Sequence, residues 1–426
     1  MNKQDVQPSP RRVDWPVTAG VVLAVFGILT YLLWLPSGLV RDGTWIGVDF
    51  HVYYASANML RRGEDMYSQI PYIYPPLLAL LVQPLAALPA NTSTMLWKAL
   101  QHLALLASWG LLVSLVPKHI RLALAALLLF GLATTVVREE VRLGQINSII
   151  LLLIVAGLYL MARSSTLQTT GGALVGLAAG IKVLPITLVA YLGTRGSRLA
   201  AIGAGATLVL LFLAQLALVP AALNSWIAHF PAVFGLTHGN IDNQSINAAL
   251  SRALLPSVHE ELPVYQLADQ AAIRPYLVWT GNILVVTVTA VVLLRQRRPT
   301  STLPFLLAVS LVLLATHMAS GSTWLAHLVD LAVVETALLW AWSEGREGWP
   351  RGRSAALAAL AGLMALLIVH PQDWVRLAAS AVPAVPLVAW IAGNIPLWVV
   401  LGLWVLTIRL ILIGRTNGQT PAPSMG

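Results

Sequence analysis

The sequence contains no cysteine, which excludes disulfide bonds and every site that depends on a thiolate. Charged residues are also scarce: they make up 10% of the 426 residues, whereas 58% are hydrophobic. A soluble domain usually carries about 25% charged residues, and so few charges cannot cover a surface that faces water. The composition therefore indicates that lipid solvates much of this protein.

Strict alternation of apolar and polar residues is lacking too, which argues against a transmembrane β-barrel. Apolar runs near 20 residues recur instead, the length that a helix needs to cross about 30 Å of hydrocarbon. The sequence therefore predicts an all-α polytopic membrane protein with about 11–13 transmembrane helices. We expect spans near residues 16–35, 93–116, 119–137, 145–163, 198–219, 276–295, 303–318, 324–342, 354–369 and 396–413, and a bent helical pair at 169–182 and 184–194.

A single transmembrane catalytic domain, 16–414, is expected between two short cytoplasmic tails, 1–15 and 415–426. The first apolar run lacks a small-residue cleavage site, so it is predicted to be a span and not a removed signal peptide. Four prolines break the apolar stretch 371–396, for which a re-entrant segment is one interpretation.

The net charge of +9 lies in short basic clusters between the apolar runs. This pattern is typical of a topology signal and of lipid headgroup contact, and it does not indicate nucleic-acid binding. If the clusters are cytoplasmic, two long polar loops, about 36–90 and 220–275, face the opposite side. The short turns at 138–145, 319–325 and 370–374 then lie on that outer side as well.

Asp49 begins an amphipathic stretch in the first outer loop. Its apolar residues fall at helical spacing, which predicts a helix along the bilayer surface; they are Phe50, Tyr53, Tyr54, Ala57 and Leu60. Asp49 could cap this helix and complement its dipole, and it could take a proton from a substrate hydroxyl that approaches from water; the two roles can coexist. A second surface helix is expected at about 76–88, after Tyr74 and two prolines.

Lys182 lies inside an apolar stretch, where a charged residue costs roughly 2.5–3.5 kcal/mol. It either snorkels to an interface or supplies a cation for a phosphate at a broken helix. His327, near the outer end of a span, is either a phosphate contact or an interfacial histidine.

Four charged residues lie in the turn before Gln145: Arg138, Glu139, Glu140 and Arg142. The second outer loop contains an N-glycosylation sequon, Asn243-Gln244-Ser245. These four charged residues form either a solvated ion-pair cluster or a contact for sugar hydroxyls. One sequon in a chain of this length arises easily by chance.

The segment GVDFHVYYASANMLRRGEDMY, together with the Tyr-Pro-Pro turn at 74–76, resembles the first outer loop of glycosyltransferase family 87. Four later segments resemble the family in the same order, so that the resemblance covers roughly 45–335: RLGQINSIILLLIVAGL, GGALVGLAAGIKVLPITLVAYL, NQSINAALSRALL and SGSTWLAHLVDL. The family comprises membrane α-mannosyltransferases of the C-type glycosyltransferase fold, similar to the mycobacterial phosphatidylinositol-mannoside mannosyltransferases, which take sugar from polyprenyl phosphate.

The resemblance implies roles for particular residues. Asp49 matches the acidic residue of the first outer loop and would be the catalytic base. The Gln-x-Asn segment corresponds to Gln145 and Asn147, and the Lys-x-x-Pro segment to Lys182 and Pro185. A later motif departs from the family, because Ala326 stands where a first histidine is common and His327 is left alone after Trp324.

The predicted function is inverting transfer of a sugar from a polyprenyl-phosphate donor to a glycolipid or glycan hydroxyl, and the resemblance implies that the sugar is mannose. We expect it at the extracytoplasmic face of a bacterial plasma membrane, without nucleic acid as a partner. Donor phosphate contacts are expected from Lys182, His327, Arg61 and Arg142. Sugar or acceptor contacts are expected from Glu139, Glu140, Gln145, Asn147, Tyr54, Tyr74, Asn243, Gln244 and Trp324.

No cofactor and no metal ion are expected, since no second carboxylate is tightly spaced with Asp49. A transporter or flippase of lipid-linked sugars would share the spans and Lys182. A convincing internal repeat is missing, however, and long amphipathic outer loops are not needed by a carrier. A transferase of arabinose or aminoarabinose remains an alternative within the same fold, and a purely structural protein would leave the outward polar cluster unexplained.

Overall fold

The computed structural model describes residues 15–416 except 42, 236–238, 256–271, 297, 300, 345–352 and 382–384. The two predicted tails lie outside this part, apart from Trp15, Arg415 and Thr416 at the ends of the terminal helices. In the first half of the chain the elements are α1 (Trp15–Leu39), β1 (Val40–Arg41), β2 (Thr44–Trp45), α2 (Val48–Arg62), α3 (Met66–Gln69), α4 (Pro76–Ala86), α5 (Ala90–Leu115), η1 (Lys118–Ile120), α6 (Arg121–Phe130), η2 (Gly131–Ala133), α7 (Thr135–Leu143), α8 (Asn147–Arg163), η3 (Ser165–Leu167), α9 (Gln168–Ile181) and α10 (Ile186–Thr194). The second half contains α11 (Arg198–Leu218), α12 (Pro220–Gly235), α13 (Ile246–Leu254), α14 (Arg274–Arg295), α15 (Thr302–Ala319), η4 (Leu325–Asp330), α16 (Leu331–Ser343), α17 (Arg353–Ala365), α18 (Pro371–Ala381), α19 (Pro386–Gly393) and α20 (Ile395–Thr416).

The all-α polytopic fold is confirmed. Among the described residues, seven helices are long and apolar enough to cross a membrane, and the bent pair Lys118–Ala133 and Thr135–Leu143 would make an eighth. These are fewer than the about 11–13 spans expected, because several expected spans are shorter in the structure. Examples are α8, with 17 residues, and the two helices α9 and α10, with 14 and 9 residues.

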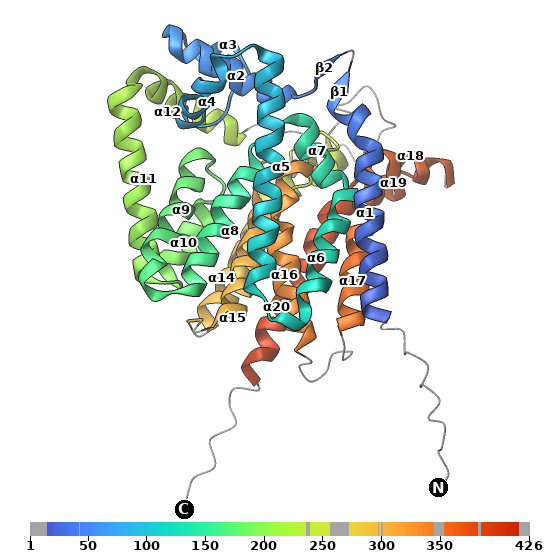
Figure 1. Ribbon diagram of the computed structural model, residues 1–426. Coiled ribbons are helices and arrows are strands. Elements are labelled where there is room, and N and C mark those ends of the chain that lie inside the picture. Colours follow the sequence, from blue (N-terminus) through green and yellow to red (C-terminus); the bar gives the residue numbers. More distant parts are fainter. Residues whose placement is uncertain are drawn as a thin grey trace, which may run out of the picture.

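Short helices gather at one end of the molecule (Figure 1), where α2, α3, α4, α7, α12, α18 and α19 form a layer over the long helices. The first residues of α1 and the last of α20 lie at the opposite end. The two predicted outer loops therefore contribute to the same layer, as the charge pattern predicts.

The bent pair that was expected between Arg163 and Arg195 is present. Helix α9 ends at Ile181 and α10 begins at Ile186, so that the chain turns back at Lys182–Pro185. Arg163 donates to the Ser114 carbonyl at the end of α5, and Arg195 donates at 3.1 Å to that of Leu293 near the end of α14. Both arginines thus lie at the end of the molecule away from the layer of short helices.

Helices α9 and α11 approach closely because small residues face each other. A Cβ atom on Gly176 would meet the Ala204 carbonyl oxygen at 2.5 Å, and one on Gly172 or Gly203 would overlap a backbone carbonyl of the other helix. Small residues allow such close contact between membrane helices. This packing holds α9, and with it the turn that carries Lys182.

The face that α2 buries is rotated from the predicted stripe. Phe50, Tyr53 and Ala57 are buried as expected, but Tyr54 and Leu60 are only half-buried, and other residues of α2 are buried as well: Ser56 and Met59. The reason is that α2 packs on α4, α5 and α7, so protein contacts, and not the bilayer surface alone, determine its orientation. Phe50 stacks on Trp97 with ring centroids 5.0 Å apart.

Candidate active site

One face of α5 holds the end of α7 and the turn that follows it. The Trp97 indole donates to the Gly144 carbonyl at 2.8 Å, and the Gln101 amide donates to the Gln145 carbonyl at 2.7 Å. The buried Lys98 ammonium donates to the Arg142 carbonyl at 3.0 Å and also to that of Val141. These donors satisfy backbone carbonyls that a helix end leaves without partners.

Gly144 makes this turn possible. Its φ of 75° is in the left-handed region, which favours glycine. A Cβ atom here would also meet the Phe50 Cβ at 2.8 Å. The tight turn directs the Gln145 side chain toward α2.

Asp49 accepts a hydrogen bond from the Gln145 side chain. Gln145 Nε2 donates to Asp49 Oδ2, and Gln145 Oε1 accepts from the hydroxyls of Tyr53 and Tyr74, each at 3.3 Å. Helix α2 has Gly47 as its N-cap and no side-chain capping bond, so Asp49 does not cap the helix, although it lies in the first turn as expected. The carboxylate instead belongs to a polar network.

Burial raises the pKa of Asp49 above its ordinary value. The Gln145 hydrogen bond and the positive charges of Lys182, Arg142 and Lys98 oppose this shift without cancelling it. A carboxylate with a raised pKa is a stronger base, and it is suited to accept a proton.

Lys182 joins the network from the α9–α10 turn. Its ammonium donates to Asn147 Oδ1 at 2.5 Å and lies 5.8 Å from the centroid of the Tyr74 ring. Asn147 in turn donates to Glu140 Oε2 at 2.9 Å. Lys182 is only 6% exposed, so it does not snorkel, and a buried cation of this kind usually serves a function.

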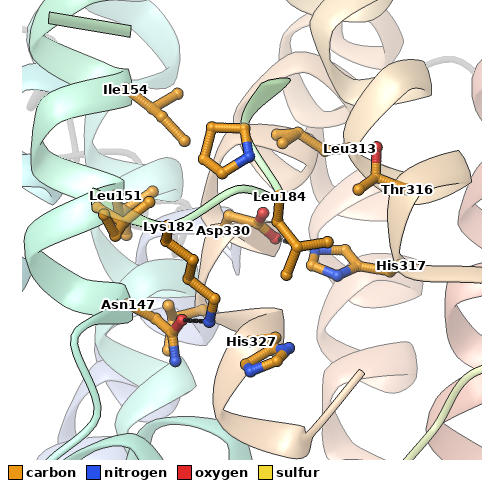
Figure 2. A pocket seen from close by; sticks show the side chains of 13 residues that line it. Asn147, Leu151, Ile154, Lys182, Leu184, Leu313, Thr316, His317, His327 and Asp330 are labelled. Atoms are coloured by element: carbon orange, nitrogen blue, oxygen red, sulfur yellow. Dashed lines mark hydrogen bonds and ion pairs between the residues drawn. The ribbon is translucent and has the colours of Figure 1, made fainter. Parts of the chain in front are cut away.

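A small cavity lies beside the Lys182 ammonium (Figure 2). It is lined by residues of α8, of the α9–α10 turn, of α15 and of η4. His327 and His317 both line it, and His317 Nε2 lies 2.7 Å from Asp330 Oδ1. The predicted phosphate residues Lys182 and His327 therefore meet at one cavity.

Two ion pairs lie at and beside α7, and we call them the charged rim. Arg142 pairs with Glu139 at 2.5 Å, and His370 pairs with Asp242 at 2.9 Å. Burial lowers the pKa of His370, but the hydrogen bond and charge of Asp242, with Glu139 and Asp373 nearby, outweigh it and raise that pKa overall. The rim thus joins α7, the second outer loop and the α17–α18 turn.

Several predicted site residues lie outside this network. Arg61 is exposed at the other end of α2, where it donates to Asn58, and the Tyr54 hydroxyl donates to the Leu88 carbonyl. Asn243 accepts from the Thr323 backbone amide at 2.9 Å and forms an isolated bridge with Trp324.

Gln244 likewise makes contacts that hold the backbone. Its amide nitrogen donates to the carbonyls of Ile241 and Gly393, and its oxygen accepts from the Leu397 amide. Asn243 and Gln244 are both buried and tie the second outer loop to its neighbours. Their predicted substrate contacts stay predictions.

Sequence analysis missed Lys98, Gln101, His317 and Asp330. The signal for Lys98 was available, because a lysine within a long apolar span is expensive and usually functional. In the part of the chain that the structure describes, no group of three or more His, Asp or Glu residues could hold a metal ion. The expectation that the reaction needs no metal ion stays a prediction.

The model of glycosyltransferase family 87 matches residues 72–321. The chain is also 31% identical over 189 residues to a polyprenol-phosphate-mannose-dependent alpha-(1-2)-phosphatidylinositol pentamannoside mannosyltransferase of Mycolicibacterium smegmatis, covering 41% of this chain and 43% of the relative. A protein of the same name from Mycobacterium tuberculosis is 28% identical over 203 residues, covering 43% of this chain and 45% of the relative. The alignments thus span less than half of these relatives, and Asp49 precedes the family match. No solved structure is significantly similar.

Proposed function

The chain belongs to glycosyltransferase family 87, and from that premise we propose that it transfers mannose from a polyprenyl-phosphate donor to a hydroxyl group of a glycolipid. The names of the two mycobacterial relatives support this donor and this class of acceptor. The seven long apolar helices of the described residues support a multi-pass membrane enzyme.

Asp49 is the proposed base. It takes the proton of the acceptor hydroxyl as the oxygen attacks the anomeric carbon from the face opposite the phosphate, so that the configuration inverts. The observation that carries this proposal is the continuous contact from Asp49 through Gln145 and Tyr74 to Lys182. This chain of contacts connects a basic carboxylate to the cavity that we assign to the donor phosphate.

Lys182 and His327 are the proposed phosphate contacts, because both line that cavity. As the bond from the anomeric carbon to the phosphate oxygen breaks, negative charge grows on the phosphate. Preorganised positive groups stabilise such charge, often as the largest single contribution to catalysis. Arg142 adds positive charge near Asp49, and we place it on the acceptor side of the network. Arg61 has no part in this mechanism.

The extracytoplasmic face is the proposed location of the chemistry, in a bacterial plasma membrane. The basic residues at the far end of the helices support this orientation by the positive-inside rule. The acceptor would then approach the layer of short helices from water, while the lipid chain of the donor stays in the bilayer.

The test compares the purified wild type with Asp49→Asn, using radiolabelled polyprenyl-phosphomannose and a candidate glycolipid acceptor. Loss of the base should lower the transfer rate by about 10²–10⁴-fold, with expression and thermal stability retained. Asp65→Asn is the matched control, because Asp65 lies in the same loop and accepts hydrogen bonds from Tyr67 and Ser225 instead. Equal turnover by Asp49→Asn would refute the assignment of the base.

Proteoliposomes without acceptor separate the enzyme from a carrier. The transferase should leave labelled donor in the leaflet where it was placed. Movement of the donor across the bilayer without transfer would support the flippase alternative instead.

A further inference from the structure

Two buried imidazole nitrogens of residues at the cavity have no hydrogen-bond partner among the residues that the structure describes. They are Nδ1 of His317, on α15, and Nδ1 of His327, on η4. Both side chains line the cavity with Lys182 (Figure 2). Buried polar atoms are nearly always paired in proteins, so two unpaired atoms at one cavity indicate a ligand that supplies their partners.

Asp330 distinguishes His317 from His327. Its Oδ1 lies 2.7 Å from His317 Nε2, and an ionised carboxylate can only accept a hydrogen bond. Nε2 therefore carries a hydrogen, and in the neutral ring Nδ1 holds a lone pair. Such a lone pair repels an anion, whereas the doubly protonated ring would donate to it, with Asp330 as counter-ion.

The surrounding charges make this protonation depend on the ligand. The charged or titratable side chains at the cavity are Lys182, His317, His327 and Asp330, and Glu140 lies behind Asn147. While the cavity holds no anion, a second cation close to Lys182 is unfavourable. A bound anion reverses this balance, because it attracts both cations.

The lining of the cavity favours an amphiphilic phosphate as that anion. Its polar lining includes Lys182, His317 and His327, and the rest of the wall is largely apolar, with leucines from three elements: Leu151, Leu184 and Leu313. A phosphate ester presents several acceptor oxygens to three donors at once. A polyprenyl chain would suit the apolar wall.

We infer that His317 and Asp330 complete the donor phosphate site, and that His317 takes up a proton when the phosphate ester binds. The inference rests on the proposed function, since it adds two residues and a linked proton to the same cavity. His317 is the phosphate contact, and Asp330 is a positioning residue that acts through it.

The probe is a mannosyl C-phosphonate ester of a short polyprenol, which cannot be transferred and keeps one negative charge between about pH 6.5 and 8.5, as a phosphate diester does. Calorimetric titration of the purified chain near pH 7.5 in buffers of different ionisation enthalpy gives the number of protons taken up. The wild type should take up close to one proton and bind more tightly as the pH falls.

His317→Gln should lower the uptake and weaken binding about tenfold at pH 7, and its affinity should depend less on pH than that of the wild type. Asp330→Asn should reduce both uptake and affinity. Thr316→Val is the matched control, because Thr316 lines the same cavity but carries no titratable group. His327→Gln should keep the uptake while it weakens binding.

Binding by the wild type without proton uptake would overturn the inference and leave the proposed function intact. Uptake in His317→Gln that equals that of the wild type would also overturn it. Failure of the wild type to bind the probe at all would count against the proposed function itself, and the inference would fall with it.

Discussion

At the scale of single residues, the important contact is between Asp49 and Gln145. Position alone allows Asp49 to be a helix cap, because aspartate at a helix start is common. In the structure the carboxylate accepts from Gln145, and the glutamine is held by two tyrosine hydroxyls and by Gln101. Gln145 therefore keeps Asp49 in one orientation, and the partial burial of Asp49 raises its pKa.

The raised pKa predicts the acid limb of the pH–rate profile. A base must be ionised to accept a proton, so kcat/KM should fall as the pH drops through the pKa of Asp49, which lies above the ordinary value of about 3.9. Gln145→Ala removes a hydrogen bond that lowers this pKa, and the limb should therefore move to higher pH. Gln69→Ala, an exposed glutamine of the same loop, should leave the limb unchanged. A limb that does not move in Gln145→Ala would contradict this role.

At the scale of elements, α5 is a membrane span with one polar face. Trp97, Lys98 and Gln101 each donate to carbonyls between Glu140 and Gln145. Together they hold the end of α7 and the following turn, and they thereby position Gln145 against Asp49.

Lys98→Met should lower the transfer rate by about 10²-fold, because a misplacement of about 1 Å at a reacting group can have an effect of that size. The donor affinity should change less, since Lys98 does not line the cavity. Lys118→Met, at an exposed position after α5, is the control for loss of a lysine. A wild-type rate in Lys98→Met would show that the end of α7 keeps its place without this lysine.

The close contact between α9 and α11 is a second feature at this scale, and it contributes to stability. A methyl group on Gly203 would overlap the Thr169 carbonyl oxygen, whereas one on Gly205 would meet nothing within 4 Å. Overpacking of this kind destabilises by about 1–3 kcal/mol, while alanine in a helix is otherwise favoured over glycine by about 1 kcal/mol. Gly203→Ala should lower the apparent melting temperature in detergent, and Gly205→Ala should keep or raise it. Equal melting of the two variants would refute the tight crossing.

At the scale of the whole molecule, the polar residues of the site converge at the end where the short helices form their layer (Figure 1). The basic residues Arg163 and Arg195 lie at the other end. The proposed chemistry and these two arginines, which we interpret as part of the topology signal, thus lie at opposite ends of the long helices.

The absence of cysteine allows a direct test of sidedness. Two single substitutions, Glu64→Cys and Ser165→Cys, place one thiol at exposed positions at the two ends. A maleimide that cannot cross membranes should label Glu64→Cys in intact cells, and Ser165→Cys only after permeabilisation. The reverse pattern would place the layer of short helices in the cytoplasm and contradict the proposed extracytoplasmic reaction.

The sequence by itself determined the membrane class, most of the apolar helices, the break at Lys182 and the family, which the match to residues 72–321 confirms. These features depend on the length of apolar runs and on local motifs, both of which can be read along the chain. Only the tertiary structure decided which polar residues meet. Gln145 reaches Asp49 across 96 positions of sequence, His317 pairs with Asp330, and Arg61 is exposed outside the network. In a helix that is apolar on every side, no periodicity shows which face turns inward, and the contacts between helices decide it.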